Sequence, residues 1–135
     1  MAIGEAGSLW SALASVPQLV ALASRGYPRS GAGSELALGE GIAGAAAASL
    51  RPVRVSDMSR VRRFGAAILG GSDEEATRRI ALPGLPDAQS QVAAPMMAQG
   101  ALYGVLFAES AGRLAFRAED AAALAIAANH AAATL

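Results

Sequence analysis

The sequence contains no cysteine and no lysine, and its 135 residues include a single histidine, His130. The missing cysteines exclude disulfide bonds, thiol catalysis, cysteine-ligated iron–sulfur clusters and thioether-linked chromophores. All eleven basic side chains are arginines, and eleven acidic side chains balance them. Such a balance provides no net field to attract a polyphosphate backbone, so we expect no nucleic-acid partner. The one basic cluster, at Arg60, Arg62 and Arg63, is more typical of a solvated surface than of a phosphate site.

Long hydrophobic runs are also missing, although hydrophobic residues make up 53% of the chain. Alanine supplies much of that fraction, and no stretch approaches the roughly 20 strongly apolar residues of a transmembrane helix. The segment Met1–Trp10 carries Glu5 where a secretory signal would carry basic residues. We therefore expect a single domain over residues 1–135, cytoplasmic and without membrane contact.

Apolar and polar residues alternate in several short segments, which favours β-strands joined by hairpins. The glycine-rich run Leu38–Gly44 predicts a tight turn that leads into a short alanine helix. Acidic residues in FRAED (Phe116–Asp120) suit the first turn of a terminal helix. This order predicts an α+β fold with a largely antiparallel sheet of five or six strands. The expected strands are Gly7–Leu13, Gln18–Ser24, Val53–Ser56, Gln89–Met97 and Ala101–Glu109, and the expected helices are Ala45–Leu50 and Phe116–Leu135.

The segment Asp57–Ala88 supports two interpretations. A capping box at Ser72–Glu75 predicts a helix through about Leu82. With Gly70-Gly71 as a hinge, the whole segment would serve as the mobile lid of a pocket. In the alternative, it is a static crossover packed on the sheet.

Catalytic motifs are hard to find in this chain. His130 lies in the last turn of the terminal helix with no serine or carboxylate beside it in sequence, a position that favours a structural role. No repeated spacing of His, Cys or carboxylate residues suggests a metal site, and no cofactor is expected. The run Gly39–Gly44 has GxGxxG spacing but lacks a parallel βαβ unit around it, so it is a weak dinucleotide signal.

Five segments taken together are more specific than any of these motifs. They are LGEGIAG (Leu38–Gly44), RPVRVSD (Arg51–Asp57), VAAPM (Val92–Met96), YGVLFAES (Tyr103–Ser110) and the alanine-rich segment that begins at Phe116. In order and spacing they resemble a GAF domain, and the similarity extends over the chain from Gly7 onward. The resemblance implies a sensor module with helices on one face of its sheet and a small-molecule pocket on the other, an arrangement shared with profilin-like folds.

The resemblance also implies partners. GAF domains of bacterial signalling proteins relay ligand binding to an attached effector, such as a kinase, cyclase or transcription regulator, and often form homodimers. The usual helix before the first strand is missing, so we interpret the chain as a fragment of a larger protein. Ser110-Ala111 replace the Asn-Lys of cyclic-nucleotide-binding members, and the methionine sulfoxide reductase members need cysteines. We therefore expect a regulatory, non-catalytic domain with an unidentified small-molecule ligand.

The GAF resemblance implies a set of ligand-binding residues. The first strand contributes Ser8 and Trp10, which share a face by alternation. We expect Val105 and Phe107 on the same side, and Gly104, Leu106 and Ala108 against the terminal helix. The full set of candidate ligand-binding residues is Ser8, Trp10, Ser24, Arg25, Ile42, Ala43, Asp57, Phe64 and Phe107.

Two alternatives remain open at this stage. The domain could be a structural dimerisation module whose pocket is filled by Trp10, Phe64 and Phe107. It could also be an enzyme of profilin-like architecture that uses Ser8, Asp57 or Arg25. The second alternative is weakened because no base is available to activate a serine.

Overall fold

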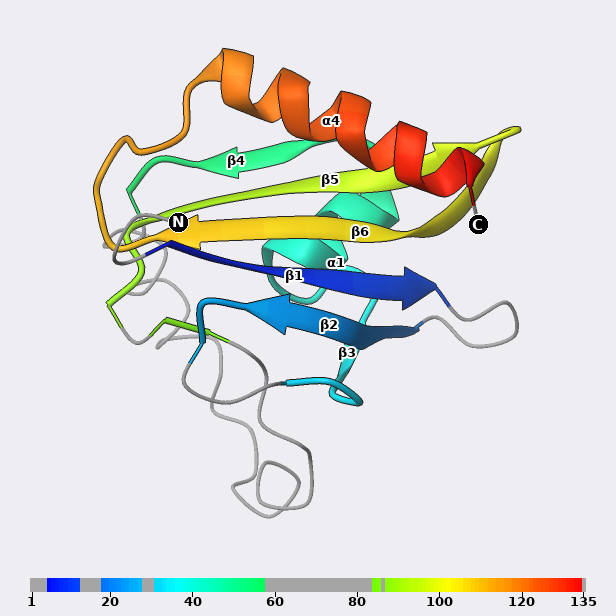
Figure 1. Cartoon of the computed structure of the whole chain (residues 1–135), viewed down its shortest axis with the longest axis horizontal. Helices are drawn as coiled ribbons and strands as arrows, with labels where there is room; N and C mark the ends of the chain where they lie inside the picture. Colours follow the sequence, from blue (N-terminus) through cyan, green and yellow to red (C-terminus); the bar gives the residue numbers. More distant parts are fainter. Residues whose placement is uncertain (1–4, 13–17, 28–30, 58–83, 86, 135) are drawn as a thin grey trace.

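A computed structural model of the chain describes residues 5–12, 18–27, 31–57, 84–85 and 87–134. Its centre is a six-stranded antiparallel sheet in the order β3-β2-β1-β6-β5-β4 (Figure 1). The α+β fold with an antiparallel sheet is therefore confirmed. The strands are β1 (Glu5–Ala12), β2 (Gln18–Arg25), β3 (Glu35–Ala37), β4 (Val53–Val55), β5 (Ser90–Ala98) and β6 (Ala101–Ser110).

Two hairpins joined by the β1–β6 pairing form the centre of the sheet, and β3 and β4 are its edge strands. β1 pairs with β2 on one side and with β6 on the other, so the N-terminal hairpin and the C-terminal hairpin share one ladder. The β5–β6 turn has positive φ at both central residues, Gln99 and Gly100. Two positive φ angles are the mark of a type I′ turn, whose twist matches that of the flanking strands. Both hairpins expected from the sequence are present.

Alternation along β6 divides the core into two layers. Leu106 packs with Ala94, Met96 and α4 (Ala118–Ala133) on one face of the sheet. Val105 and Phe107 pack with Trp10 on the other face. The predicted facing of these three β6 residues is confirmed.

Helix α1 (Gly41–Ser49) packs on the face opposite α4, so the two helices do not share one face. It begins within the glycine-rich run, four residues before the expected start. Small side chains allow it to lie close to the sheet, with Ala43, Ala46 and Ala47 buried. Gly44 is required here because a Cβ atom would lie 2.6 Å from the carbonyl oxygen of Ala37. Helix α1 therefore lies where it can form a wall of a site on this face.

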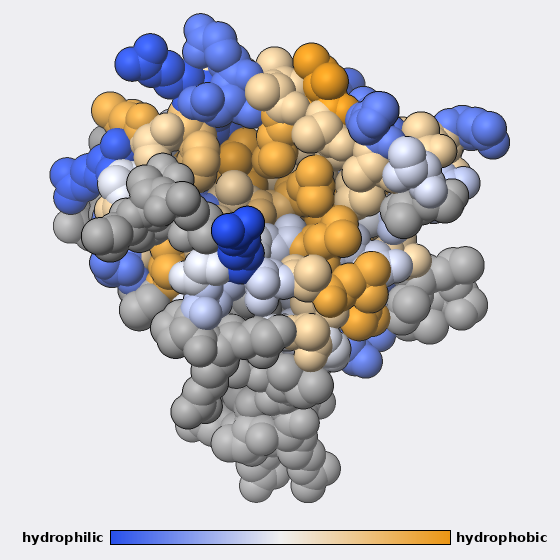
Figure 2. Space-filling view, viewed as in Figure 1, coloured by the Kyte–Doolittle hydropathy of each residue, from blue (hydrophilic) through white to orange (hydrophobic). Residues whose placement is uncertain are grey.

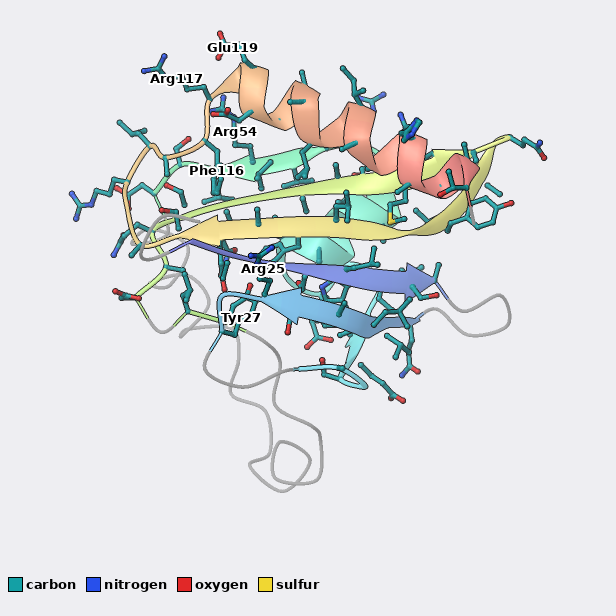
Figure 3. The ribbon with its side chains drawn as sticks, viewed as in Figure 1. Arg25, Tyr27, Arg54, Phe116, Arg117 and Glu119 are labelled. Carbon is teal, nitrogen blue, oxygen red and sulfur yellow. The ribbon has the colours of Figure 1, made fainter. Side chains whose placement is uncertain are left out.

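Hydrogen bonds tie the segment before α4 to the end of the sheet. The fully buried Ser90 hydroxyl donates to the Gly112 carbonyl at 2.6 Å and accepts from the Ala115 amide at 3.2 Å. Arg54 of β4 donates to the carbonyl of Phe116 at 2.9 Å (Figure 3). The Asp120 side chain accepts from the Arg117 amide at 2.7 Å, which caps the helix start. These bonds position the first turn of α4 relative to β4, β5 and β6.

The predicted helix at Ser72–Leu82 and the interior of the predicted lid lie outside the described residues. Within the described ranges, no helix combines the length and the apolar character needed to cross a membrane.

Candidate functional site

A cavity of about 300 Å³ lies between α1 and the sheet, on the face opposite α4. Apolar side chains form most of its wall, and two polar side chains form the rest. Residues 84 and 85, just before β5, border it as well. The lining residues are Trp10, Leu36, Gly41, Ile42, Ala43, Gly84, Leu85, Gln91, Phe107 and Glu109.

The aromatic wall is built by two neighbouring central strands. Trp10 on β1 is 3% exposed and packs with Val105, its register partner on β6. Phe107 is two residues further along β6 and pairs with Ser8. The indole Nε1 of Trp10 donates to the buried Ser8 hydroxyl at 2.9 Å, which satisfies both groups and fixes the indole ring. Ser8 therefore supports the cavity wall through Trp10.

The wall across from the sheet is the first turn of α1. Ile42 and Ala43 border the cavity, together with Gly41. Ile42 and Ala43, two of the candidate ligand-binding residues, therefore lie at the cavity.

The polar wall is centred on Glu109, which is only 1% exposed. Its Oε1 accepts from the Leu85 backbone amide at 2.7 Å, and its Oε2 accepts from Gln91 Nε2 at 2.8 Å. Gln91 is the register partner of Glu109 on β5, so the pairing of the strands holds the two side chains together. The carboxylate is thus held in a fixed position beside the cavity.

The hydroxyl of Tyr27 lies near this carboxylate. It is enclosed near Ser8 as well but makes no hydrogen bond of good geometry. Burial, and then the negative charge of Glu109, raise the pKa of the Tyr27 hydroxyl well above its ordinary value. The phenol therefore stays protonated and remains a hydrogen-bond donor next to the polar wall.

The structure brings together Trp10, Ile42, Ala43 and Phe107 of the predicted set, with Ser8 beside them. Ser24 and Arg25 instead line a second groove with Leu124 of α4, which Ser8 and Phe107 also border. Figure 3 labels Arg25. Asp57 is half-buried after β4 and is not among the residues that line the cavity. Phe64 lies outside the described residues.

Sequence reasoning missed Glu109, Gln91 and Tyr27. The first of these could have been found by alternation, because Glu109 has the same parity as Val105 and Phe107 along β6. From the sequence alone it is only the last residue of the expected strand Ala101–Glu109. Gln91 follows from Glu109 once the strands are paired in register. Tyr27 gives no such signal, since it lies in a loop after β2.

The arrangement is suited to binding. Within the described ranges, no group of three or more His, Asp or Glu residues could hold a metal ion. His130 is exposed on α4, on the face of the sheet away from the cavity. Among the described residues, no imidazole therefore reaches the Ser8 hydroxyl to act as its base.

Comparison with known proteins agrees with this fold. A sequence model of the GAF domain matches residues 4–135. The type II free methionine-R-sulfoxide reductase from Thermoplasma acidophilum has a TM-score of 0.67 at 20% identity, with 97% of this chain and 78% of that chain covered. The GAF domain from an Acinetobacter phosphoenolpyruvate-protein phosphotransferase has a TM-score of 0.64 at 21% identity, with 98% and 75% covered.

A third solved structure is the free methionine-R-sulfoxide reductase of Staphylococcus aureus with its substrate. It has a TM-score of 0.68 at 16% identity, and the match covers 96% of this chain and 71% of that chain. A search of curated proteins gave no significant match. These TM-scores establish a shared fold, and the family match extends over nearly the whole chain. The chain belongs to the GAF domain family.

Proposed function

We propose that this domain is a regulatory, non-catalytic sensor that binds a small molecule between α1 and the sheet. The observation that carries the proposal is the cavity of about 300 Å³ next to Trp10 and Phe107. In the part of the chain that the structure describes, both aromatic side chains border the space without filling it, which favours a ligand over the alternative of a side-chain-filled structural module. Pockets of this kind, apolar with a few fixed polar groups, are typical small-molecule sites.

A catalytic role is less well supported. Two of the similar structures are methionine-R-sulfoxide reductases. This chain has no cysteine, so none of its own side chains could provide a thiol for redox chemistry. Ser8 and its neighbours could bind a substrate, but the described residues place no base beside the hydroxyl.

The relay part of the proposal rests on residues adjacent to the polar wall. Gln91 and Glu109 face the cavity, and their chain neighbours Ser90 and Ser110 form another register pair. The Ser90 hydroxyl binds both Gly112 and Ala115, in the segment that leads into α4. A ligand that shifts Glu109 would therefore also shift the start of α4, which an attached effector domain or a dimer partner could detect.

Native mass spectrometry of the purified protein tests the binding proposal. We expect a co-purified small molecule, or one captured from a metabolite extract. Ala43→Phe should abolish its binding because the new ring occupies the cavity. Ala48→Phe on the exposed side of α1 should leave binding unchanged, and circular dichroism should show that both variants fold. A wild-type protein that captures nothing from the extract would contradict the proposal.

A further inference from the structure

Glu109 is a buried carboxylate whose hydrogen-bond partners are both neutral. They are the Leu85 amide and the Gln91 side chain. Among the described residues, no arginine or histidine forms an ion pair with it. A buried charge is costly unless a charge of opposite sign or several hydrogen bonds compensate it. The N–H dipoles of the Leu85 amide and the Gln91 side chain supply part of that compensation.

The carboxylate retains capacity for further donors. An ionised carboxylate offers about four acceptor positions. The Leu85 amide and the Gln91 side chain occupy one on each oxygen, and the nearby Tyr27 hydroxyl can take at most one more. Glu109 also borders the cavity, so its remaining capacity is available to a bound molecule. A ligand with a positively charged N–H group would supply a charge of opposite sign, which none of these neutral partners supplies, and a further donor.

The other walls determine the rest of the ligand. Trp10, Ile42 and Phe107 present apolar surface, and aromatic rings also attract organic cations. At about 30 Å³ per non-hydrogen atom, taken from the volume of water, the cavity holds roughly ten such atoms. A metal ion would require more oxygen ligands than this wall offers.

We propose that the cavity selects a small protonated amine with an apolar body, whose ammonium group binds Glu109. This inference rests on the proposed sensor function, since it identifies the chemical class of the ligand at the same site. Gln91 is a positioning residue that holds the carboxylate toward the ligand. Anionic molecules of the same size are repelled by Glu109.

Three probes of nearly equal size test the inference by calorimetry: 2-phenylethylamine, 2-phenylethanol and phenylacetate. We expect the amine to bind about tenfold more tightly than the alcohol, in line with a charge-assisted hydrogen bond, and phenylacetate to bind weakest. Glu109→Gln should reduce the affinity for the amine about tenfold and leave that for the alcohol within about twofold. Glu119→Gln, which removes an exposed acid from α4, should change neither.

The outcomes separate the two proposals. If the amine and the alcohol bind equally and Glu109→Gln has no effect, the amine inference is overturned while the sensor function stands. A co-purified ligand that lacks a basic nitrogen has the same consequence. If no probe binds and nothing co-purifies, both proposals fail. Thermal unfolding of Glu109→Gln shows whether the variant is folded, and the alcohol's affinity shows whether its cavity is intact.

Discussion

Gly104 on β6 lies where the backbone of β1 approaches most closely. A Cβ atom at this position would overlap the carbonyl oxygen of Trp10, which cannot move without disturbing the β1–β6 ladder. We therefore expect Gly104→Ala to lower the free energy of unfolding by about 2–3 kcal/mol. Gly112→Ala is the matched control, because its Cβ would lie 3.6 Å from the Ser110 hydroxyl, an ordinary contact. Urea unfolding compares the two, and equal stabilities would contradict the steric argument.

The hydroxyl of Tyr27 makes the stability of the domain decrease with rising pH in the alkaline range. The pKa of the folded-state phenol is raised above the unfolded value of about 10. Below pH 10 the phenol is protonated in both states, so its contribution is fully present. As pH rises above 10, the unfolded chain releases the proton while the folded chain retains it, and stability is lost.

Tyr27→Phe removes this titration. Between pH 10 and 12, the unfolding midpoint of the variant should fall less steeply than that of the wild type. At pH 7 the variant should be at least as stable, because the buried hydroxyl it loses has no hydrogen-bond partner of good geometry. Thermal unfolding across this pH range is the measurement, and parallel curves would contradict the assignment.

The alternation of side chains along a strand predicted which residues of β6 face the cavity side of the sheet. Val105 and Phe107 lie on that side together with Trp10. The period of a strand is fixed, and apolar residues reveal which face is buried. Glu109 obeys the same period but was missed, because burial of an acid depends on donors from other segments. One of these donors, the Leu85 amide, lies 24 residues away in sequence. Local pattern therefore fixes the orientation of a side chain more readily than its electrostatic surroundings.

At the scale of elements, short pieces were the hardest to predict. Strand β3 has three residues between glycine-rich turns, and it exists because Leu19 of β2 pairs with Leu36. Helix α1 begins at Gly41, where intrinsic propensity is poor, since packing against the sheet compensates for it. The long hairpins and α4 carry enough periodic residues to be predicted from sequence alone.

The end of α1 offers a second stability test. Leu50 caps the helix in the left-handed region, with φ at 57°, and its side chain is 49% exposed. Leu50→Gly should stabilise the protein by about 0.5–1 kcal/mol, because glycine adopts this conformation without strain. Ser49→Gly, one residue earlier in the helix, should destabilise it by a similar amount. Chemical denaturation of the two variants should thus give opposite signs, and equal signs would argue against the capping geometry.

At the scale of the whole molecule, the face that carries α4 retains exposed apolar surface. Figure 2 shows apolar residues over α4 and the neighbouring strands. Ile126 on α4 is 73% exposed. Leu124 on the same helix borders two grooves, one that it shares with Phe116 and one that it shares with Leu9. The helix buries only Ala128 and Ala132 fully, so its larger side chains are left at the surface. Contiguous apolar surface of this kind marks interaction sites.

We predict that the protein forms a homodimer through this face, since a two-fold interface places the same patch on both subunits. Ile126→Arg would bring two like charges into the contact, so it should shift the protein from dimer to monomer in light scattering. Ala48→Arg adds the same charge on the exposed side of α1, on the opposite face of the sheet, and should leave the dimer intact. Both variants should remain folded, because both positions are solvent-exposed. A wild-type protein that stays monomeric at high concentration would contradict the prediction, and dissociation by both variants would place the interface elsewhere.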